Sequence, residues 1–324
     1  MLQEAIFNIQ SPSDFDTAAL EVFRFQYKNN TIYNTFCNHL NIQLKEINSV
    51  KDIPFLPIQF FKSHKIITRN TREVITFSSS GTTGNTTSKH YVSDLNIYQK
   101  SFRNCFQQFY GPITDYVILG LLPSYLEREG SSLIYMVNDL INNSKQPLSG
   151  FYLNNVEALV DTLNLLQNKK QKTLLIGVSY ALLDLVEKYN LSLNDTIIME
   201  TGGMKGRRKE LIREALHNKL KKGFGVHTIH SEYGMTELLS QAYSKKNGVF
   251  ICPTWMQVFI RDPEDALTIQ DQKSGGLNII DLANINSCSF IATQDLGKKF
   301  SDGSFEILGR FDNSDIRGCN LMIL

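Results

Sequence analysis

With 324 residues, of which 42% are hydrophobic and 20% charged, the chain can bury a substantial core in one large domain or two ordinary ones. The formal net charge of +1 reflects no excess of basic residues, which argues against nucleic acid as a partner. The first residues lack the basic start and apolar core of a signal peptide, and no apolar stretch is long enough to span a bilayer. We therefore expect a cytoplasmic protein.

The first 70 residues predict a helical N-terminal part. Apolar side chains recur at helical spacing between residues 13 and 48, and Ser11 followed by Pro12 is typical of a helix start. A proline-punctuated connector follows at residues 52–57. No chemistry is assigned to this part.

The stretch at residues 76–90 combines hydroxyl side chains with glycines. An apolar run at residues 74–77 predicts a strand, and the loop after it contains Ser79, Ser80, Gly81, Thr82, Thr83 and Gly84. Such a loop can wrap a phosphate with backbone N–H groups and hydroxyls, because glycine permits close approach and unusual dihedral angles. The alternative interpretation is a solvated polar turn.

Strands and helices alternate after this loop. We predict strands at residues 115–122, 173–178, 196–200 and 226–229, and helices at residues 94–109, 131–141, 156–167, 181–189 and 205–220. This order is typical of a parallel sheet covered by helices on both faces, in which ligands bind at the carboxyl ends of the strands. We therefore predict an α/β core over residues 71–247.

The pattern changes at residue 248. Short strands are predicted at residues 256–260, 277–281, 289–293 and 304–308, separated by turn signals. Residues 248–324 thus form a predicted β-rich C-terminal portion that ends in a short arm. We expect the three parts to make one integrated domain.

Polar motifs occupy several of the predicted strand ends. Gly202-Gly203 leads into a predicted helix N-terminus, a turn that suits an anion or the close approach of a planar group. Residues 233–237 place an aromatic ring, a glycine, a hydroxyl and a carboxylate within five positions. Asp295 lies in Thr-Gln-Asp, and residues 309–312 are Gly-Arg-Phe-Asp.

In this order the motifs resemble the signatures of the acyl-adenylate-forming enzymes. The family's phosphate loop, Thr-Ser-Gly-Thr-Thr-Gly, is close to residues 79–84, and its adenine motif, Tyr-Gly-x-Thr-Glu, is met in full by residues 233–237. Its hinge motif, Gly-Arg-x-Asp, is met by residues 309–312. The matches lie between residues 77 and 312.

Within that superfamily the chain looks most like the acyl-protein synthetase of bacterial luminescence, which activates fatty acids for a reductase. Three stretches suggest this: residues 122–132, residues 202–206 and the ending Asp-Ile-Arg-Gly-Cys at residues 315–319. The resemblance implies that ATP and a carboxylic acid, fatty or aromatic, form an acyl-adenylate. The acyl group would then pass to Cys319 and on to a partner protein, a reductase, acyltransferase or carrier.

The resemblance also implies roles for individual residues, except for Lys205 and His90, which are candidates by position alone and could equally be a surface helix lysine and a loop histidine. Ser79 to Gly84 would hold the phosphates of ATP, with Gly202 and Gly203 nearby. Tyr233 and Gly234 would contact adenine, Thr236 the α-phosphate, and Asp295 with Arg310 the ribose. Glu237 would bind Mg²⁺, which takes one or two carboxylates beside phosphate oxygens and water. Lys205 would meet a phosphate or the carboxylate, and His90 would approach the acid.

The sequence departs from the superfamily pattern in two respects. The usual Pro-Lys after the phosphate loop is absent, and Lys89 arrives late, directly before His90. Twelve residues follow Asp312, whereas superfamily members carry a mobile cap domain there that contributes a catalytic lysine. We therefore expect the large adenylating domain without the cap, so that the terminal arm or a partner shields the adenylate.

The five cysteines, Cys37, Cys105, Cys252, Cys288 and Cys319, are scattered singly, which argues against a disulfide framework or a zinc cluster. Four are interpreted as buried thiols. For Cys319 two interpretations stay open: an acyl acceptor whose thiol pKa Arg317 lowers, or an ordinary cysteine of a terminal strand.

Two other functions remain open as well. One is a ligase of the phenylacetate-CoA type, in which coenzyme A or a carrier protein supplies the thiol. The other is a catalytically silent subunit that binds adenylate.

Overall fold

The computed structural model describes residues 2–79, 86–123, 130–202, 211–265, 267–271 and 273–311. Its mixed helices and strands confirm the predicted α/β class. The described helices are α1 (Leu2–Ala5), α2 (Pro12–Asn29), α3 (Thr31–His39), α4 (Phe60–Ser63), α5 (Leu95–Tyr110), α6 (Ser132–Ser144), α7 (Val156–Asn168), α8 (Ser179–Lys188) and α9 (Arg213–Phe224), with short 3₁₀ turns η1 (Val50–Asp52), η2 (Ile113–Asp115) and η3 (Leu282–Asn284).

The strands fall into two large sheets and one hairpin. They are β1 (Leu56–Pro57), β2 (Ile75–Ser78), β3 (Lys89–Val92), β4 (Val117–Leu121), β5 (Gly150–Phe151), β6 (Thr173–Val178), β7 (Thr196–Thr201), β8 (His230–Tyr233), β9 (Ala242–Ser244), β10 (Val249–Phe250), β11 (Met256–Arg261), β12 (Ser274–Asp281), β13 (Phe290–Lys299) and β14 (Phe305–Arg310). Within the described residues, no helix combines the length and the apolar character that crossing a membrane requires.

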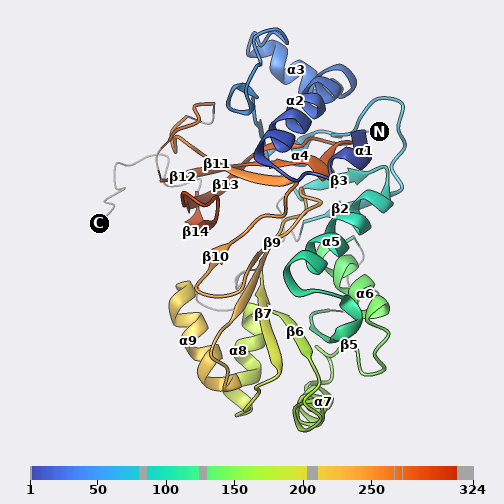
Figure 1. The fold of residues 1–324 in the computed structure, drawn as a ribbon, viewed down its shortest axis with the longest axis vertical. Coiled ribbons are helices and arrows are strands. Elements are labelled where there is room, and N and C mark those ends of the chain that lie inside the picture. The colour runs from blue at the N-terminus through green and yellow to red at the C-terminus, as the bar shows by residue number, and fades with distance from the viewer. Residues whose placement is uncertain are drawn as a thin grey trace.

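The predicted parallel sheet is present in the lower half of Figure 1. Its strand order is β5-β4-β6-β7-β8-β9, and every neighbouring pair is parallel except β8 with β9. Figure 1 shows α8 and α9 on one side of this sheet and α5 and α6 on the other. Covered on both faces, β4 and β6 are buried at every position, which explains their continuous apolar sequence.

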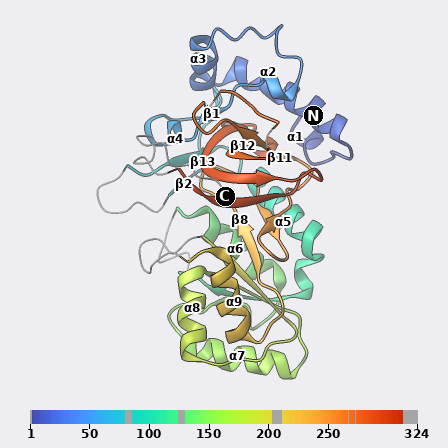
Figure 2. The same cartoon turned by 90° about the vertical axis from the view of Figure 1, so that its left-hand side faces the viewer.

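The second sheet, here the C-terminal sheet, has the order β10-β14-β13-β12-β11. Its neighbouring strands run antiparallel, as the turn-separated short strands predict. β1 adds a parallel edge to β13, with Leu56 opposite Ile291. β1 therefore attaches the helical N-terminal part to the C-terminal sheet (Figure 2).

The N-terminal helices begin where the local sequence directs them. Ser11 caps α2: its hydroxyl accepts the Asp14 N–H at 3.1 Å, and the Asp14 carboxylate accepts the Ser11 N–H at 2.9 Å. This capping box, with Pro12 in the first turn, satisfies amide groups that a helix start leaves unpaired. The predicted start at Ser11-Pro12 is confirmed.

Two predicted elements differ from the structure. The strand predicted at residues 226–229 is wrong: pairing with β7 begins only at His230, opposite Met199. The apolar residue that suggested it, Ile229, is buried but lies before the paired segment. The helix predicted at residues 205–220 is wrong at its start: residues 211 and 212 are not helical, and α9 begins at Arg213 because Ile212, with ψ 146°, leaves the helical conformation; residues 203–210 lie outside the described part.

Candidate active site

The glycine turn and the aromatic motif follow neighbouring parallel strands. In the β7–β8 register Thr201 lies opposite Glu232, so Gly202 and Tyr233 come next on adjacent strands. Gly202 adopts φ 62°, a left-handed conformation that favours glycine, and its carbonyl accepts the Ser179 hydroxyl at 2.7 Å. The structure thus brings these two motifs to one sheet edge, where ligands of such sheets bind.

Tyr233, Asp295 and Arg310 form one cluster between the two sheets. The Tyr233 hydroxyl donates to Asp295 Oδ2 at 2.7 Å, and Arg310 Nε donates to Asp295 Oδ1 at 2.9 Å. Asp295 lies directly opposite Arg310 in the β13–β14 register. Tyr233 and Arg310, which are 77 positions apart in the sequence, therefore both bind the Asp295 carboxylate.

The electrostatics of this cluster are asymmetric. The Asp295 side chain is 5% exposed, whereas the Arg310 side chain is 74% exposed. Burial, and then the neighbouring Asp295 charge, raise the pKa of Tyr233 well above its usual value, so the phenol remains a donor. The Tyr233 ring packs 5.8 Å from Phe250 and 5.6 Å from Phe305, which fixes its orientation.

The turn that follows Tyr233 is held by buried polar side chains of the C-terminal sheet. Asn284 Nδ2 donates to the Glu237 carbonyl at 2.7 Å. One carboxylate oxygen of Asp281 accepts the backbone N–H groups of Leu239 and Ser240, both at 2.9 Å. Asp281 is fully buried, and burial raises its pKa to about 6 despite these donors. These hydrogen bonds to Asn284 and Asp281 therefore hold the turn in place.

Glu237 presents a buried carboxylate at this turn. The residue is 6% exposed, and burial raises its pKa, whereas a hydrogen bond from Ser88 and the charges of Arg310 and Lys62 lower it. One buried carboxylate fits the needs of Mg²⁺, which completes its shell with water and phosphate oxygens. Among the described residues, no group of three or more His, Cys, Asp or Glu side chains could hold a metal by itself.

His90 is fully engaged by the protein. Its Nδ1 lies 2.9 Å from the Thr236 carbonyl oxygen and its Nε2 lies 2.9 Å from Ser287 Oγ. Because a carbonyl only accepts, Nδ1 carries the proton, and Nε2 of the neutral ring accepts from the Ser287 hydroxyl. Burial lowers the pKa of His90 to about 4. This placement favours a positioning role, tying β3 to the Thr236 turn, over the predicted approach to the acid.

Glu232 forms a second buried acidic group beneath the motif. Its carboxylate accepts the Thr201 hydroxyl. Burial and, to a smaller extent, the neighbouring Glu200 charge raise its pKa to about 7, although the hydrogen bond from Thr201 lowers it. A Cβ at Gly234 would clash with a Glu232 carboxylate oxygen, so a larger residue there would force this buried side chain to shift.

The remaining sequence candidates divide into two groups. Ser79 lies at the base of the phosphate loop, where its N–H donates to the Ser88 carbonyl and its hydroxyl accepts the Ser88 N–H, both at 3.0 Å. The others lie outside the described residues: Ser80, Gly81, Thr82, Thr83, Gly84, Gly203, Lys205 and Cys319. Their roles stay predictions.

Four supporting residues escaped the sequence analysis. They are Ser88, which bonds Glu237, and Asp281, Asn284 and Ser287, which hold the turn and His90. Asp281, Asn284 and Ser287 are spaced three apart around the 3₁₀ turn η3, which gathers side chains on one side. Nothing in the local sequence, however, connects Asp281 and Asn284 to the turn that they hold, 41 to 47 positions earlier. The same is true of Ser287 and His90, which are 197 positions apart.

Comparison with known proteins gives a family match for the N-terminal part of the chain. Residues 8–115 match the family model of the acyl-protein synthetase LuxE. No curated protein sequence matches the chain significantly.

Solved structures share the fold. The chain resembles a 2-hydroxyisobutyryl-CoA ligase bound to 2-HIB-AMP and CoA, with a TM-score of 0.67, 12% identity and coverage of 94% of this chain and 77% of that one. It also resembles ATP-bound MatB from Rhodopseudomonas palustris, with a TM-score of 0.55 and 17% identity. That match covers 75% of this chain but spans only 49% of MatB. Residues 8–115 are therefore similar to the acyl-protein synthetases, and the fold of the chain is similar to that of these two solved structures.

Proposed function

We propose that the protein activates a carboxylic acid with ATP to form an acyl-adenylate. The observation that carries the proposal is the convergence of Tyr233 and Arg310 on the Asp295 carboxylate, beside the turn that bears Glu237. A buried carboxylate at a sheet edge can accept ribose hydroxyls, and an aromatic ring of fixed orientation offers a face for a purine.

In the proposed reaction a carboxylate oxygen of the acid attacks the α-phosphorus of ATP. A new C–O–P linkage forms, the bond to the β-phosphate breaks, and pyrophosphate leaves. The protein mainly has to position the reactants and stabilise charge. Asp295 and Arg310 would hold the ribose, and Tyr233 and Gly234 the base. Thr236 would contact the α-phosphate.

The negative charge that develops on the phosphates must be stabilised by cations and hydrogen-bond donors. Glu237 would hold Mg²⁺, which neutralises phosphate oxygens when bound. The loop at residues 79–84 and the turn at Gly202 and Gly203 would add backbone N–H donors. Lys205 would meet a phosphate or the substrate carboxylate.

The second proposed step is transfer of the acyl group to Cys319. The thiolate attacks the acyl carbonyl, an S–C bond forms, the bond to AMP breaks, and AMP leaves. The other four cysteines support this choice: all are free, and burial raises the pKa of Cys37 and of Cys252 to about 12 and those of Cys105 and Cys288 as well. Thiols so protonated are poor nucleophiles. A partner protein would then receive the acyl group.

Two measurements test the proposal. Pyrophosphate release is followed after addition of ATP, Mg²⁺ and each of a panel of fatty and aromatic acids. Release that depends on the acid is expected, and its absence across the panel would leave a silent adenylate-binding subunit. A radiolabelled acid should then label the protein through a thioester that hydroxylamine cleaves. Label at the wild-type level in Cys319→Ser would refute the assignment, and Cys252→Ser is the matched control.

A coenzyme A ligase is the second candidate, because a structural neighbour is a CoA ligase with adenylate and CoA bound. In that case a free acyl-CoA would form and the protein would carry no covalent label. The labelling experiment with and without CoA separates the two functions.

A further inference from the structure

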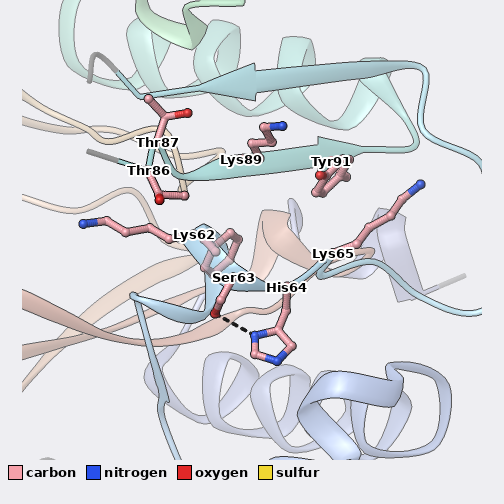
Figure 3. Close-up of a pocket in the computed structure, with 9 residues that line it drawn as sticks. Lys62, Ser63, His64, Lys65, Thr86, Thr87, Lys89 and Tyr91 are labelled. Carbon is pink, nitrogen blue, oxygen red and sulfur yellow. Dashed lines mark hydrogen bonds between the residues drawn. The ribbon is translucent and has the colours of Figure 1, made fainter. Parts of the chain in front are cut away.

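A cationic pocket of about 400 Å³ opens between α4 and strand β3. The lining residues are Phe61, Lys62, Ser63, His64, Lys65, Thr86, Thr87, Lys89 and Tyr91. Figure 3 shows Lys62, Thr86 and Thr87 at one end of this pocket and Lys65 with Tyr91 at the other. None of these lining residues carries a carboxylate, so the pocket suits an anion.

The three lysines of the pocket are not equivalent. Lys65 Nζ lies 2.7 Å from a Glu73 carboxylate oxygen and 5.1 Å from the centre of the Tyr91 ring. Its charge is therefore already balanced. Lys62 and Lys89, by contrast, form no ion pair with any of the residues that the structure describes, and both are exposed.

The pocket is connected to the candidate active site through Glu237. The pocket residue Phe61 packs against His90 with ring centroids 5.6 Å apart, and His90 Nδ1 lies 2.9 Å from the carbonyl oxygen of Thr236, the neighbour of Glu237. The Glu237 carboxylate itself accepts a hydrogen bond from Ser88. Ser88 lies between the pocket residues Thr87 and Lys89. The pocket therefore adjoins the carboxylate that would hold the metal of a metal–polyphosphate complex.

The sequence suggests why positive charge would be needed beside the phosphate loop. The phosphate loop lacks the lysine that the superfamily pattern places directly after it, and a departing pyrophosphate carries several negative charges. Lys62 comes from α4, before the loop in the chain, and Lys89 comes from β3, after it. The two cations flank the loop from both sides in sequence and line one pocket in space.

We propose that the pocket holding Lys62 and Lys89 is a polyphosphate site that receives the pyrophosphate end of ATP and retains pyrophosphate before its release. This proposal rests on the adenylation proposed above and adds to it a named source of positive charge. A phosphate-bearing coenzyme A could bring similar chemistry to the pocket, so the experiment includes it as a separate probe.

The test measures binding of magnesium pyrophosphate, AMP and coenzyme A by titration calorimetry, with no acid present. Wild-type protein should bind pyrophosphate, and Lys62→Ala and Lys89→Ala should each weaken that binding about tenfold or more, because each removes a charge-assisted contact. AMP binding should change less than twofold. Lys62→Arg should retain most of the affinity, because the charge remains.

Two further variants serve as controls. Lys65→Ala should weaken pyrophosphate binding less than Lys62→Ala does, because Glu73 already neutralises Lys65. Lys188→Ala removes an exposed lysine of α8 that pairs with Glu157, and it should leave binding unchanged. Thermal unfolding of each variant checks that the fold is intact.

Unchanged pyrophosphate affinity in Lys62→Ala, or no pyrophosphate binding by wild-type protein, would overturn the proposal. Binding of coenzyme A that depends on Lys62, without binding of pyrophosphate, would overturn the pyrophosphate assignment. These outcomes are separable from the proposed function: if acids fail to elicit pyrophosphate release while pyrophosphate binding still depends on Lys62, only the adenylation reaction fails.

Discussion

The cluster of Tyr233, Asp295 and Arg310 and the pocket of Lys62 and Lys89 both act on the charge environment of Glu237, yet they are built differently. In the cluster, the central carboxylate is buried and accepts two hydrogen bonds from its neighbours. In the pocket, both lysines are exposed and unpaired with any described carboxylate.

The difference corresponds to what each region would hold. A nucleoside has a defined shape, and its hydroxyls need acceptors fixed in advance, which favours a rigid, buried cluster. A polyphosphate is recognised chiefly by its charge and must leave after the reaction. Flexible, solvated lysines lose little when it departs. The predictions below test whether this division holds.

The largest effect is expected between the two regions, at Glu237. In Glu237→Gln the side chain keeps its size but loses the charge that would hold Mg²⁺. Acid-dependent pyrophosphate release should fall about 1,000-fold, a loss of ~4 kcal/mol of charge stabilisation. The Mg²⁺ concentration for half-maximal rate should also rise. Glu157→Gln, at an exposed carboxylate, is the control; a loss under tenfold with unaltered Mg²⁺ dependence would contradict the metal role.

A smaller loss is expected in the buried cluster. Asp295→Asn removes the charge shared by Tyr233 and Arg310, and kcat/KM for ATP should fall about 100-fold, since hydrogen bonds to charged groups contribute ~1.5–3 kcal/mol each. Pyrophosphate binding should be unaffected if the two regions act separately. Asp302→Asn, in an exposed turn of the same sheet, is the control. A parallel loss of pyrophosphate affinity would show that the division is wrong.

A substitution at His90 tests how much its two hydrogen bonds stabilise the fold between the two regions. His90→Phe preserves the packing against Phe61 but leaves the Thr236 carbonyl and the Ser287 hydroxyl without their partner. We expect a loss of ~2 kcal/mol in the free energy of unfolding, measured by denaturant titration at pH 7.5.

The same variant gives a pH test. The His90 pKa is about 4 in the folded protein against an ordinary value of 6.5, so protonation opposes folding. The contribution of His90 to the free energy of unfolding should be complete above pH 6.5. It should decline by on the order of 3 kcal/mol as the pH falls toward 4. The difference in stability between wild type and His90→Phe should therefore shrink in acid. A constant difference from pH 7.5 to 4 would exclude a buried neutral histidine.

The smallest effect is expected at Tyr233. Tyr233→Phe keeps the ring that Phe250 and Phe305 orient and removes only the hydroxyl bonded to Asp295. KM for ATP should rise about fivefold, corresponding to ~1 kcal/mol for one hydrogen bond. Tyr233→Ala should have a clearly larger effect, because the ring itself is lost. Equal effects of the two substitutions would argue against a role for the ring face.

Much of the fold could be predicted because its signals are local. The strand at Thr173–Val178 has the same bounds in prediction and structure, since a buried parallel strand is continuously apolar. The start of α2 followed from Ser11 and Pro12, whose capping geometry needs only neighbouring residues. The prediction for β8 was wrong because the bounds of this strand depend on its pairing with β7. The apolar residues before His230 do not indicate where that pairing begins.

The candidate site divides in the same way. The sequence by itself determined the order of the motifs and their location at strand ends, because glycine turns and motif residues are local chemistry. Only the tertiary structure decided that Asp295 serves both Tyr233 and Arg310, that His90 is engaged at both ring nitrogens, and that Lys62 shares a pocket with Lys89. The physical reason is that strand register and packing bring distant residues within hydrogen-bond distance, and no local pattern in the chain encodes that proximity.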